Sequence, residues 1–415
     1  MIQTYSGHNP SLGAIVSVSV FLFFAPMLSV QAGYTFAAVS LLLTSIYFLA
    51  TRPTFSIDRE DKTLIALLLA VFLASLFSFL YHGNRPRSLD LPSRYLLVIP
   101  ILLLMLKVPP RLSWWWAGLI VGCVSAAGVA LWQIYGLGEL RAVGFTGVIQ
   151  FGDLGLVMGA FCAAGLPWAK SQRDAQFWKM ALVTGVLAGA YTSIASGSRG
   201  GWLAVPFIVV VFCAAFLSRR NIKQALAMLA ILCVGLIIVA KSVPTIESRY
   251  REAVNEIQRY QTERVSNTSL GLRLEMWRSL TLMIPQKPWL GWSEKEYNEG
   301  LKQLVAEGKV KADVLTMANT HNNYLELLAF QGVVGLLPVL ALLAAALWFY
   351  GRRLRSGNIA VQAMAVCGTS LLVAYPVFGM SQVILGRNNT LLFFVVALAI
   401  TWGVLRHEEQ QAGSL

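Results

Sequence analysis

Long apolar blocks alternate along the chain with short polar segments. A helix that crosses a bilayer needs about 20 mostly apolar residues, and twelve blocks approach that length. They cover residues 11–30, 33–51, 63–81, 95–107, 113–135, 148–169, 180–195, 201–218, 224–241, 322–350, 360–381 and 390–405. The fourth, seventh and last are the shortest for a full span. The pattern predicts an all-α, polytopic membrane protein with about 12 transmembrane helices.

Composition agrees with many spans rather than one anchor. Hydrophobic residues make up 56% of the 415 residues and charged residues only 13%, whereas a soluble protein carries about a quarter. The first block has no basic segment before it and no small-residue cleavage site after it, so we expect a retained helix, not a signal peptide. The five cysteines all lie in apolar blocks, which argues against disulfides and a cysteine metal site. They are Cys123, Cys162, Cys213, Cys233 and Cys367.

The basic residues divide unevenly between alternate short loops. One set of loops holds fifteen: Arg52, Arg59, Lys62, Lys107, Arg111, Lys170, Arg173, Lys179, Arg219, Arg220, Lys223, Arg352, Arg353, Arg355 and Arg406. The other set holds six: Arg85, Arg87, Arg94, Arg141, Arg199 and Arg387. Because basic loops stay in the cytoplasm, both termini are predicted to be cytoplasmic. The net charge of +13 is then a topology signal, and no nucleic-acid partner is expected.

One long loop, residues 242–320, is predicted on the opposite, periplasmic face within a single membrane domain, 1–415. Apolar residues at helical spacing predict an amphipathic helix in its first half, between Glu247 and Arg264, lying on the membrane surface or on the bundle. A second helix, from Leu270 to Met283, is predicted to end at Pro285 and Pro288.

The six basic residues of the periplasmic short loops are all arginine, while the cytoplasmic loops mix arginine and lysine. A guanidinium group binds two phosphate oxygens at once and stays charged. The bias therefore predicts an anionic substrate on this face. The alternative is simple ion pairing with Asp90, Glu139 or Asp153 at the membrane surface.

Two positions on this face are candidates for chemistry. Arg199 lies in a Gly- and Ser-rich turn, 196–202, where small residues let the backbone approach a ligand and the next helix begins, which favours anions. The alternative is an ordinary turn. His321 lies where the long loop meets an apolar block, and a neutral imidazole can take a proton from a hydroxyl. The alternative is a capping or packing residue. Gly332 and Gly335 by themselves indicate only helix packing.

Other catalytic signatures are missing from the sequence. There is no zinc signature, nucleotide-binding phosphate loop or nucleophile elbow. Asp313 stands alone in the long loop, and Glu294, Glu296 and Glu299 fit a solvated helix face. We therefore expect no metal and no cofactor, which argues against a nucleotide-driven pump and against metal-dependent glycosyl transfer.

Three motifs together resemble the O-antigen ligase and polymerase superfamily. His321-Asn322, a nine-residue spacer and Gly332-Val333-Val334-Gly335 resemble its signature. The turn Ser198-Arg199-Gly200-Gly201-Trp202 resembles a second motif, and the loop arginine Arg273 in Gly271-Leu272-Arg273-Leu274-Glu275-Met276-Trp277 resembles a third. Arg141 with Gly144-Phe145-Thr146-Gly147 is similar to an outer-loop element. The motifs cover about 200 residues, and the topology covers the whole chain.

Within the superfamily the chain most resembles the O-antigen ligases. That resemblance implies a GT-C-like fold in the inner membrane of a Gram-negative bacterium. It implies metal-independent, inverting transfer of O-antigen polysaccharide from undecaprenyl diphosphate to lipid A–core, in lipopolysaccharide biosynthesis. His321 would be the general base, and Arg199, Arg273 and Arg141 would bind the diphosphate. Arg85, Arg87, Arg94, Arg387 and Asn322 are further expected substrate contacts.

Two alternatives stay open at the level of sequence. An O-antigen polymerase would use the same donor with a different acceptor. The related protein O-oligosaccharyltransferases are a poorer match, because they usually carry a further C-terminal periplasmic region and this chain ends at Leu415, soon after its last apolar block. A transporter for an anionic lipid or sugar is an alternative of another class, although transporters usually place charges near the bilayer midplane. Here the candidates gather at one interface.

Overall fold

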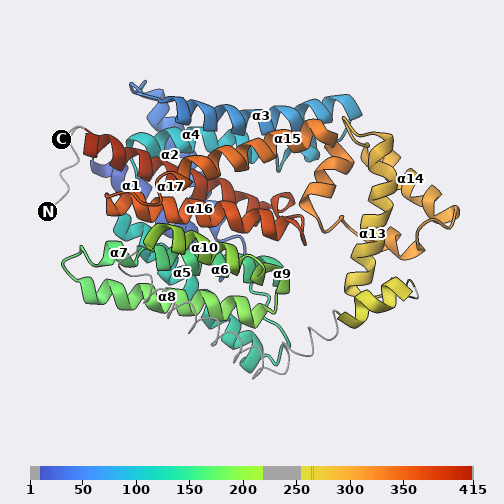
Figure 1. The fold of residues 1–415 in the computed structure, drawn as a ribbon. Helices are drawn as coiled ribbons and strands as arrows, with labels where there is room; N and C mark the ends of the chain where they lie inside the picture. The colour runs from blue at the N-terminus through green and yellow to red at the C-terminus, as the bar shows by residue number, and fades with distance from the viewer. Residues whose placement is uncertain (1–9, 218–253, 263, 265, 414–415) are drawn as a thin grey trace. The chain divides into compact units, whose positions relative to one another are not determined.

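The computed structural model describes residues 10–217, 254–262, 264 and 266–413. These residues form helices and no strands (Figure 1). The α-helices are α1 (Pro10–Phe24), α2 (Tyr34–Ala50), α3 (Arg59–His82), α4 (Ser93–Lys107), α5 (Leu112–Leu131), α6 (Val148–Ala164), α7 (Leu166–Ala169), α8 (Ala175–Ser196), α9 (Arg199–Trp202), α10 (Val205–Phe216), α13 (Ser269–Met283), α14 (Glu294–Ala306), α15 (Asn323–Gly351), α16 (Ile359–Gly379) and α17 (Asn388–Gly413). Short helices are η1 (Pro86–Leu89), η2 (Trp132–Gly136), η3 (Ile284–Gln286), η4 (Ala312–Thr316) and η5 (Ile384–Gly386).

Among the described residues, eight helical segments are long and apolar enough to cross a membrane. They are Arg59–His82, Pro86–Lys107, Leu112–Gly136, Val148–Ala169, Arg199–Phe216, Asn323–Gly351, Ile359–Gly379 and Asn388–Ala412. Helices α1 and α2 are apolar but shorter. Helix α8 has 22 residues and is not among the eight, and the predicted block 224–241 lies outside the described residues. The prediction of an all-α, multi-pass membrane protein is confirmed, whereas a count of twelve spans stays a prediction.

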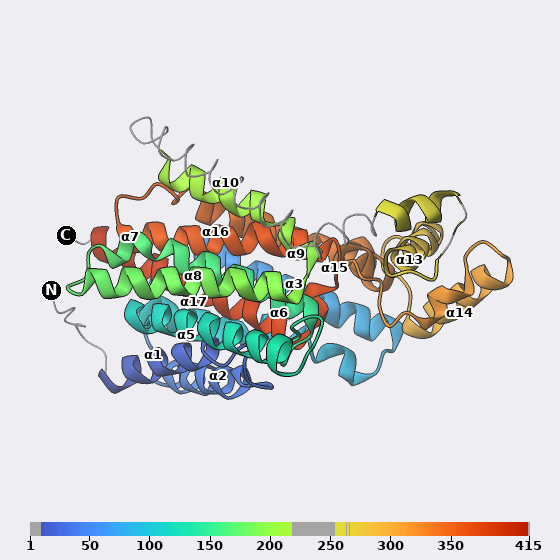
Figure 2. The ribbon, with the colours of Figure 1, turned by 90° about the horizontal axis from the view of Figure 1, so that it is seen from below.

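The chain divides into two compact units. The first comprises Met1–Leu73, Pro86–Ala215 and Pro338–Leu415, and the second Ala74–Arg85 and Phe216–Leu337. Helices α3 and α15 contribute residues to both. The long helices of the first unit run alongside one another, α16 beside α17 and α6 beside α8 (Figures 1 and 2). The four described cysteines are free thiols, while Cys233 lies outside the described residues.

Glycines set the close approach of α6 and α8 in the first unit. A Cβ on Gly189 would lie 2.6 Å from the carbonyl oxygen of Gly155 and 2.8 Å from the Cα of Gly159. Small residues at such crossings let two backbones pack directly in an apolar medium. The crossing fixes the carboxyl end of α8 against the amino end of α6, where the Arg199 turn begins.

Charged residues form an interlocked network at one end of this bundle, which we call the ion-pair end (Asp58–Asp61, Arg352–Arg353 and Arg406–Glu409). Arg406 pairs with Asp58, Asp61 and Glu409, and Arg353 pairs with Glu60 and Glu409. Asp61 is fully buried and also accepts a hydrogen bond from the Trp402 indole, 2.8 Å away. Charges buried near a membrane surface persist when they are paired, so this network holds the ends of α3, α15 and α17 together.

The second unit has its own apolar core, built by α13, α14, η4 and the first part of α15. Its buried members are Met276, Leu280, Met283, Tyr297, Leu301, Leu304, Val310, Val314 and Ala329. The predicted helix between Leu270 and Met283 is confirmed as α13, and residues 254–262 of the predicted amphipathic helix are helical. Residues 247–253 and 263 lie outside the described residues, and Arg264 lies beyond the helix. Glu294 and Glu296 begin α14, where Ser293 and Glu296 form a capping box, as expected of a solvated face.

Helix α15 is broken at Gly332, where φ is 62° and ψ is −161°. A Cβ there would lie 2.3 Å from the carbonyl carbon of Trp289. The amides of Val333 and Val334 donate to the carbonyls of Pro288 and Trp289, at 2.9 and 3.2 Å. The Gly-x-x-Gly segment was expected to be a helix-packing feature. Its first glycine instead lets another stretch of main chain insert at the break.

Candidate functional site

The Arg199 turn joins α8 to α9. Gly197 ends α8 with a φ of 63°, the left-handed conformation that glycine adopts at helix ends. The Ser198 amide then donates to the Ser196 hydroxyl at 3.1 Å, and Arg199 opens the four-residue helix α9. Arg199 therefore lies at a sharp, internally bonded corner between two apolar helices, as its sequence predicted.

Arg141 lies directly beside this turn. Its Nε donates to the carbonyl of Ser196 at 2.7 Å and its Nη2 to the carbonyl of Gly197 at 3.0 Å. These carbonyls end α8, where the helix dipole is negative. The loop after Arg141 is fixed by Gln133, whose Oε1 accepts from the amides of Val143 and Gly144, both at 2.9 Å. Gln133 belongs to the π-helix η2, a local form that often marks functional sites.

The inner side of the turn packs on α6. The Ser198 hydroxyl donates to Asp153 Oδ1 at 3.1 Å, and both residues are buried. A Cβ on Gly201 would lie 2.3 Å from that same oxygen, and a Cβ on Gly200 would lie 2.3 Å from the Ser381 hydroxyl. The small residues of the turn thus permit close approach, as expected. The groups that approach are side chains of the protein itself.

Three more of the predicted arginines lie in the first unit. Arg94 pairs with Asp90 at 3.0 Å and donates from Nε to the Asn388 side chain at 3.2 Å, so the expected alternative of ion pairing holds for this residue. Arg387 immediately precedes Asn388, at the start of α17. Arg87 lies in η1. The structure brings Arg94 and Arg387 to neighbouring helix ends, α4 and α17.

His321 lies in the second unit, in a tight turn that leads into α15. Its own φ is 52°, a left-handed conformation uncommon for a residue with a side chain. The Asn319 side chain accepts from the His321 amide at 3.0 Å, and the Asn322 side chain accepts from the amides of Tyr324 and Leu325 at 3.0 and 3.1 Å. Asn322 is therefore a helix cap, and it fixes where α15 begins.

Two further contacts hold the His321 turn. The Thr320 amide donates to the Glu326 carboxylate at 2.9 Å, and the Trp277 indole donates to the Thr320 carbonyl at 2.9 Å. Trp277 and Arg273 are four residues apart on α13, so they share one face of that helix. The structure thus brings the helix of Arg273 to the His321 turn in the second unit. Arg85 belongs to the same unit.

An ion pair anchors the middle of α13. Glu275 is fully buried and accepts from Arg264 at 3.0 Å, from the Tyr260 hydroxyl at 2.6 Å and from the Lys311 amide at 2.9 Å. Burial and the hydrogen bond to Glu275 raise the pKa of Tyr260 to about 12, so its hydroxyl remains a donor. These bonds fix the register of α13, and with it the position of Arg273.

The sequence did not predict the hydrogen bonds by which Gln133, Ser198, Trp277 and Glu326 shape these turns. It gave Asp153 only as a possible ion-pair partner. One signal was available for Asp153, because an acidic residue inside an apolar block marks a functional site by default. The contacts of Ser198 with Asp153 and of Trp277 with Thr320 join residues 45 and 43 positions apart. Those of Gln133 and Glu326 are local contacts within loops and turns, and residue spacing does not report either kind.

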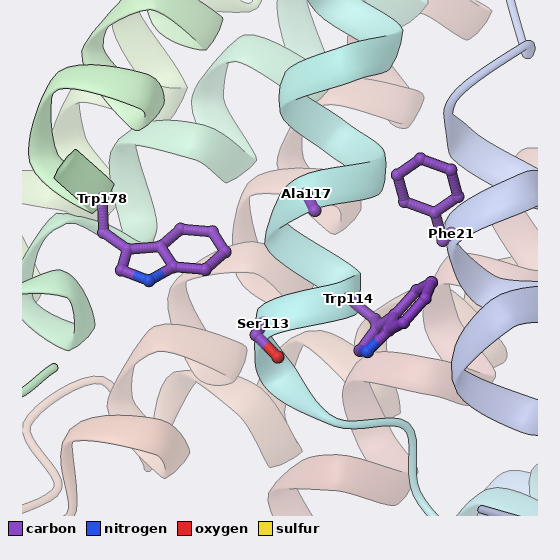
Figure 3. A pocket seen from close by; sticks show the side chains of 5 residues that line it. All are labelled: Phe21, Ser113, Trp114, Ala117 and Trp178. Atoms are coloured by element: carbon purple, nitrogen blue, oxygen red, sulfur yellow. The ribbon is translucent and has the colours of Figure 1, made fainter. Parts of the chain in front are cut away.

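A shallow groove between α1, α5 and α8 contains none of the predicted residues. Phe21, Ser113, Trp114, Ala117 and Trp178 line it, with Trp114 against Phe21 on one side and Trp178 on the other (Figure 3). Its volume is about 240 Å³, below the usual range for a small-molecule site. Among the described residues, no three His, Cys, Asp or Glu side chains are grouped so as to hold a metal ion.

Comparison with known proteins finds one family whose match spans three of these motifs. A family described as O-antigen ligase matches residues 184–340, a stretch that contains Arg199, Arg273 and His321. A protein of Haemophilus influenzae described only as uncharacterized is 28% identical over 393 residues, covering 92% of this chain and 96% of its own length. An O-antigen ligase of Escherichia coli is 25% identical over 216 residues, covering 48% of this chain and 51% of its own length.

Proposed function

We propose that the protein is a glycosyltransferase acting in lipopolysaccharide assembly. The match of residues 184–340 to a family described as O-antigen ligase supports this proposal. The similarity to an O-antigen ligase of Escherichia coli supports a role in O-antigen assembly. The more specific proposal is an O-antigen ligase that moves a polysaccharide from undecaprenyl diphosphate to a sugar hydroxyl of lipid A–core. The enzyme would lie in the Gram-negative inner membrane with both termini in the cytoplasm and its site on the periplasmic face, as the basic-residue bias of the short loops supports.

His321 is the proposed general base. It takes the proton of the acceptor hydroxyl, and the hydroxyl oxygen attacks the anomeric carbon of the donor sugar. The bond from that carbon to the phosphate oxygen breaks, and undecaprenyl diphosphate leaves with the electron pair, inverting the anomeric configuration. Because the lipid diphosphate is itself the leaving group, the reaction as proposed uses no nucleotide, metal or cofactor.

Arginines are the proposed electrostatic part of the site. Arg199 and Arg273 would hold the diphosphate and stabilise the charge that builds on it as the bond breaks. Arg141 was expected to do the same, and its hydrogen bonds to the end of α8 now give it a second task, holding the Arg199 turn. Arg85, Arg87, Arg94, Arg387 and Asn322 remain proposed substrate contacts, with Arg94 partly neutralised by Asp90.

The observation that carries the proposal is the bond between the Trp277 indole and the Thr320 carbonyl. It ties the helix of Arg273 to the residue before His321, so a phosphate-binding group and a base are held by one local framework. The strained His321 backbone supports the same view, because unfavourable backbone conformations persist where the surroundings enforce them, often at active sites.

Reconstitution of the purified protein with a choice of acceptors tests the proposal. The donor would be undecaprenyl-diphosphate-linked glycan, offered with lipid A–core, with a second lipid-linked glycan, or with neither. A ligase gives product only with lipid A–core, and a polymerase lengthens the lipid-linked glycan. Movement of the donor across a vesicle membrane without any new glycosidic bond would instead establish a transporter.

A further inference from the structure

The buried side chain of Asp153 has no role in the proposed chemistry, yet it lies under the Arg199 turn. It is 1% exposed and stands in the second turn of α6, within the apolar segment Val148–Ala169. An ionisable group there is costly, and such groups persist where they serve a site. Its hydrogen-bond partner is the hydroxyl of Ser198, the residue before Arg199.

We infer that Asp153 is a positioning residue that fixes Arg199 through Ser198. The inference rests on the proposed function, because it concerns the placement of a proposed diphosphate-binding arginine. Asp153 acts on the turn from two directions. Its Oδ1 accepts from Ser198, and the same oxygen packs against Gly201 so closely that a methyl group at Gly201 would lie 2.3 Å from it.

The other sides of the turn are held as well. Arg141 bonds the carbonyls of Ser196 and Gly197, and Ser381 occupies the space beside Gly200. Gly152, the neighbour of Asp153, has no room for a side chain, because a Cβ there would lie 2.1 Å from the Ser196 hydroxyl. Arg199 is therefore presented by a corner that is clamped between α6, the end of α16 and Arg141. Asp153 is the acidic side chain on the α6 side.

A kinetic cycle with Arg199 separates positioning from general stability. We expect Asp153→Ala and Ser198→Ala each to lower kcat about 10- to 100-fold, since a displacement of about 1 Å in a positioned group can cost 100-fold. KM for the donor should change less than about 3-fold, because the loss falls on the transition state. In an Arg199→Ala background, Asp153→Ala should lower kcat by less than about 3-fold more, since coupled residues are not additive.

Conservative and space-filling variants test whether the effect comes from the contacts of Asp153 with the turn. Asp153→Asn keeps an oxygen that accepts from Ser198 and should stay within about 5-fold of the wild-type rate, given the typical worth of one neutral hydrogen bond. Gly201→Ala should lower the transfer rate, because its added methyl group displaces the Asp153 side chain. Gly128→Ala is the matched control, since nothing lies within 4 Å of a Cβ at that helical glycine, and it should leave the rate unchanged.

Hydrogen exchange at the amides of 197–201 reports on the turn without any transfer assay. Faster exchange in Asp153→Ala, by at least about 10-fold, is expected from a loosened turn. The inference would be overturned if hydrogen exchange were unchanged in Asp153→Ala, or if that variant transferred glycan at the wild-type rate. It would also be overturned if the losses of Asp153→Ala and Arg199→Ala multiplied in the double variant. If Asp153→Ala does not fold, Ser198→Ala completes the same cycle. A wild-type protein that forms no glycosidic bond while the exchange effect persists would contradict the proposed function and leave the positioning intact.

Discussion

The two ends of the helix bundle in the first unit use arginine in opposite ways. At the ion-pair end, Arg353 and Arg406 bond carboxylates, and one of these, Asp61, is fully buried. At the other end, which we call the arginine end (Arg94, Arg141, Arg199 and Arg387), Arg141 bonds main-chain carbonyls and the buried acid Asp153 bonds a hydroxyl. At the ion-pair end, the charged side chains join helices to one another. At the arginine end, the contacts shape a turn that presents Arg199.

Arg94 marks the limit of this contrast. It lies at the arginine end but pairs with Asp90, whose side chain is 61% exposed. A pair with so exposed a partner contributes little to stability, so Arg94 would lose little by exchanging Asp90 for a phosphate of the proposed substrate. The comparison therefore predicts that variants at the arginine end lose rate and keep stability, whereas variants at the ion-pair end lose stability and keep rate.

The largest effect should come from Arg199→Ala compared with Arg352→Ala. Arg352 pairs with Glu60 at the ion-pair end and is half exposed, which makes it a matched arginine outside the proposed site. Removing a preorganised donor to the developing charge should lower the transfer rate about 10²- to 10³-fold for Arg199→Ala. Arg352→Ala should stay within about 3-fold. Equal losses in both variants would erase the distinction between the two ends.

A second prediction reverses the roles of rate and stability. Arg406→Ala leaves the buried Asp61 without its cation, and breaking a buried pair in this way costs about 3–5 kcal/mol. Denaturant unfolding in detergent should show that loss, while the protein that remains folded should transfer glycan at the wild-type rate. A stable but inactive Arg406→Ala protein would place this end in the mechanism.

The smallest effect concerns an exposed ion pair of the second unit. The hydrogen bond from Lys287, 2.6 Å long, together with the capping bonds of Ser293, lowers the pKa of Glu296 from 4.5 to about 2. A lowered folded-state pKa stabilises the protein above pH 4.5, and that contribution is lost as the pH falls toward 2. Since both side chains are exposed, Lys287→Ala should cost under about 1 kcal/mol. Thermal unfolding at pH 7 and pH 3 checks this against Lys302→Ala, and a loss as large as that of Arg406→Ala would contradict it.

Sequence periodicity predicted the helices well because the membrane imposes a single, long-range pattern. Blocks such as 148–169 and 360–381 became α6 with α7 and α16, and the turn at Arg199 was visible as small residues between two blocks. Local signals of this kind depend only on neighbouring residues, so one sequence is enough to show them.

Contacts between distant residues could not be predicted in this way. The Asp153–Ser198 bond spans 45 residues and the Trp277–Thr320 bond spans 43. The break at Gly332 depends on the main chain of Trp289, which the spacing of Gly332 and Gly335 does not reveal. Such contacts are set by helix crossings, and they decide which of the predicted arginines share a neighbourhood.

The most direct test of the account is the transfer activity of His321→Ala, measured with undecaprenyl-diphosphate-linked glycan and lipid A–core. His407→Ala is the control, because that histidine lies near the carboxyl end of α17, where it bonds Gln411. Loss of a general base should lower the rate about 10²- to 10⁴-fold, with normal folding and membrane insertion, while His407→Ala should match the wild type. Full transfer by His321→Ala would contradict the proposed mechanism.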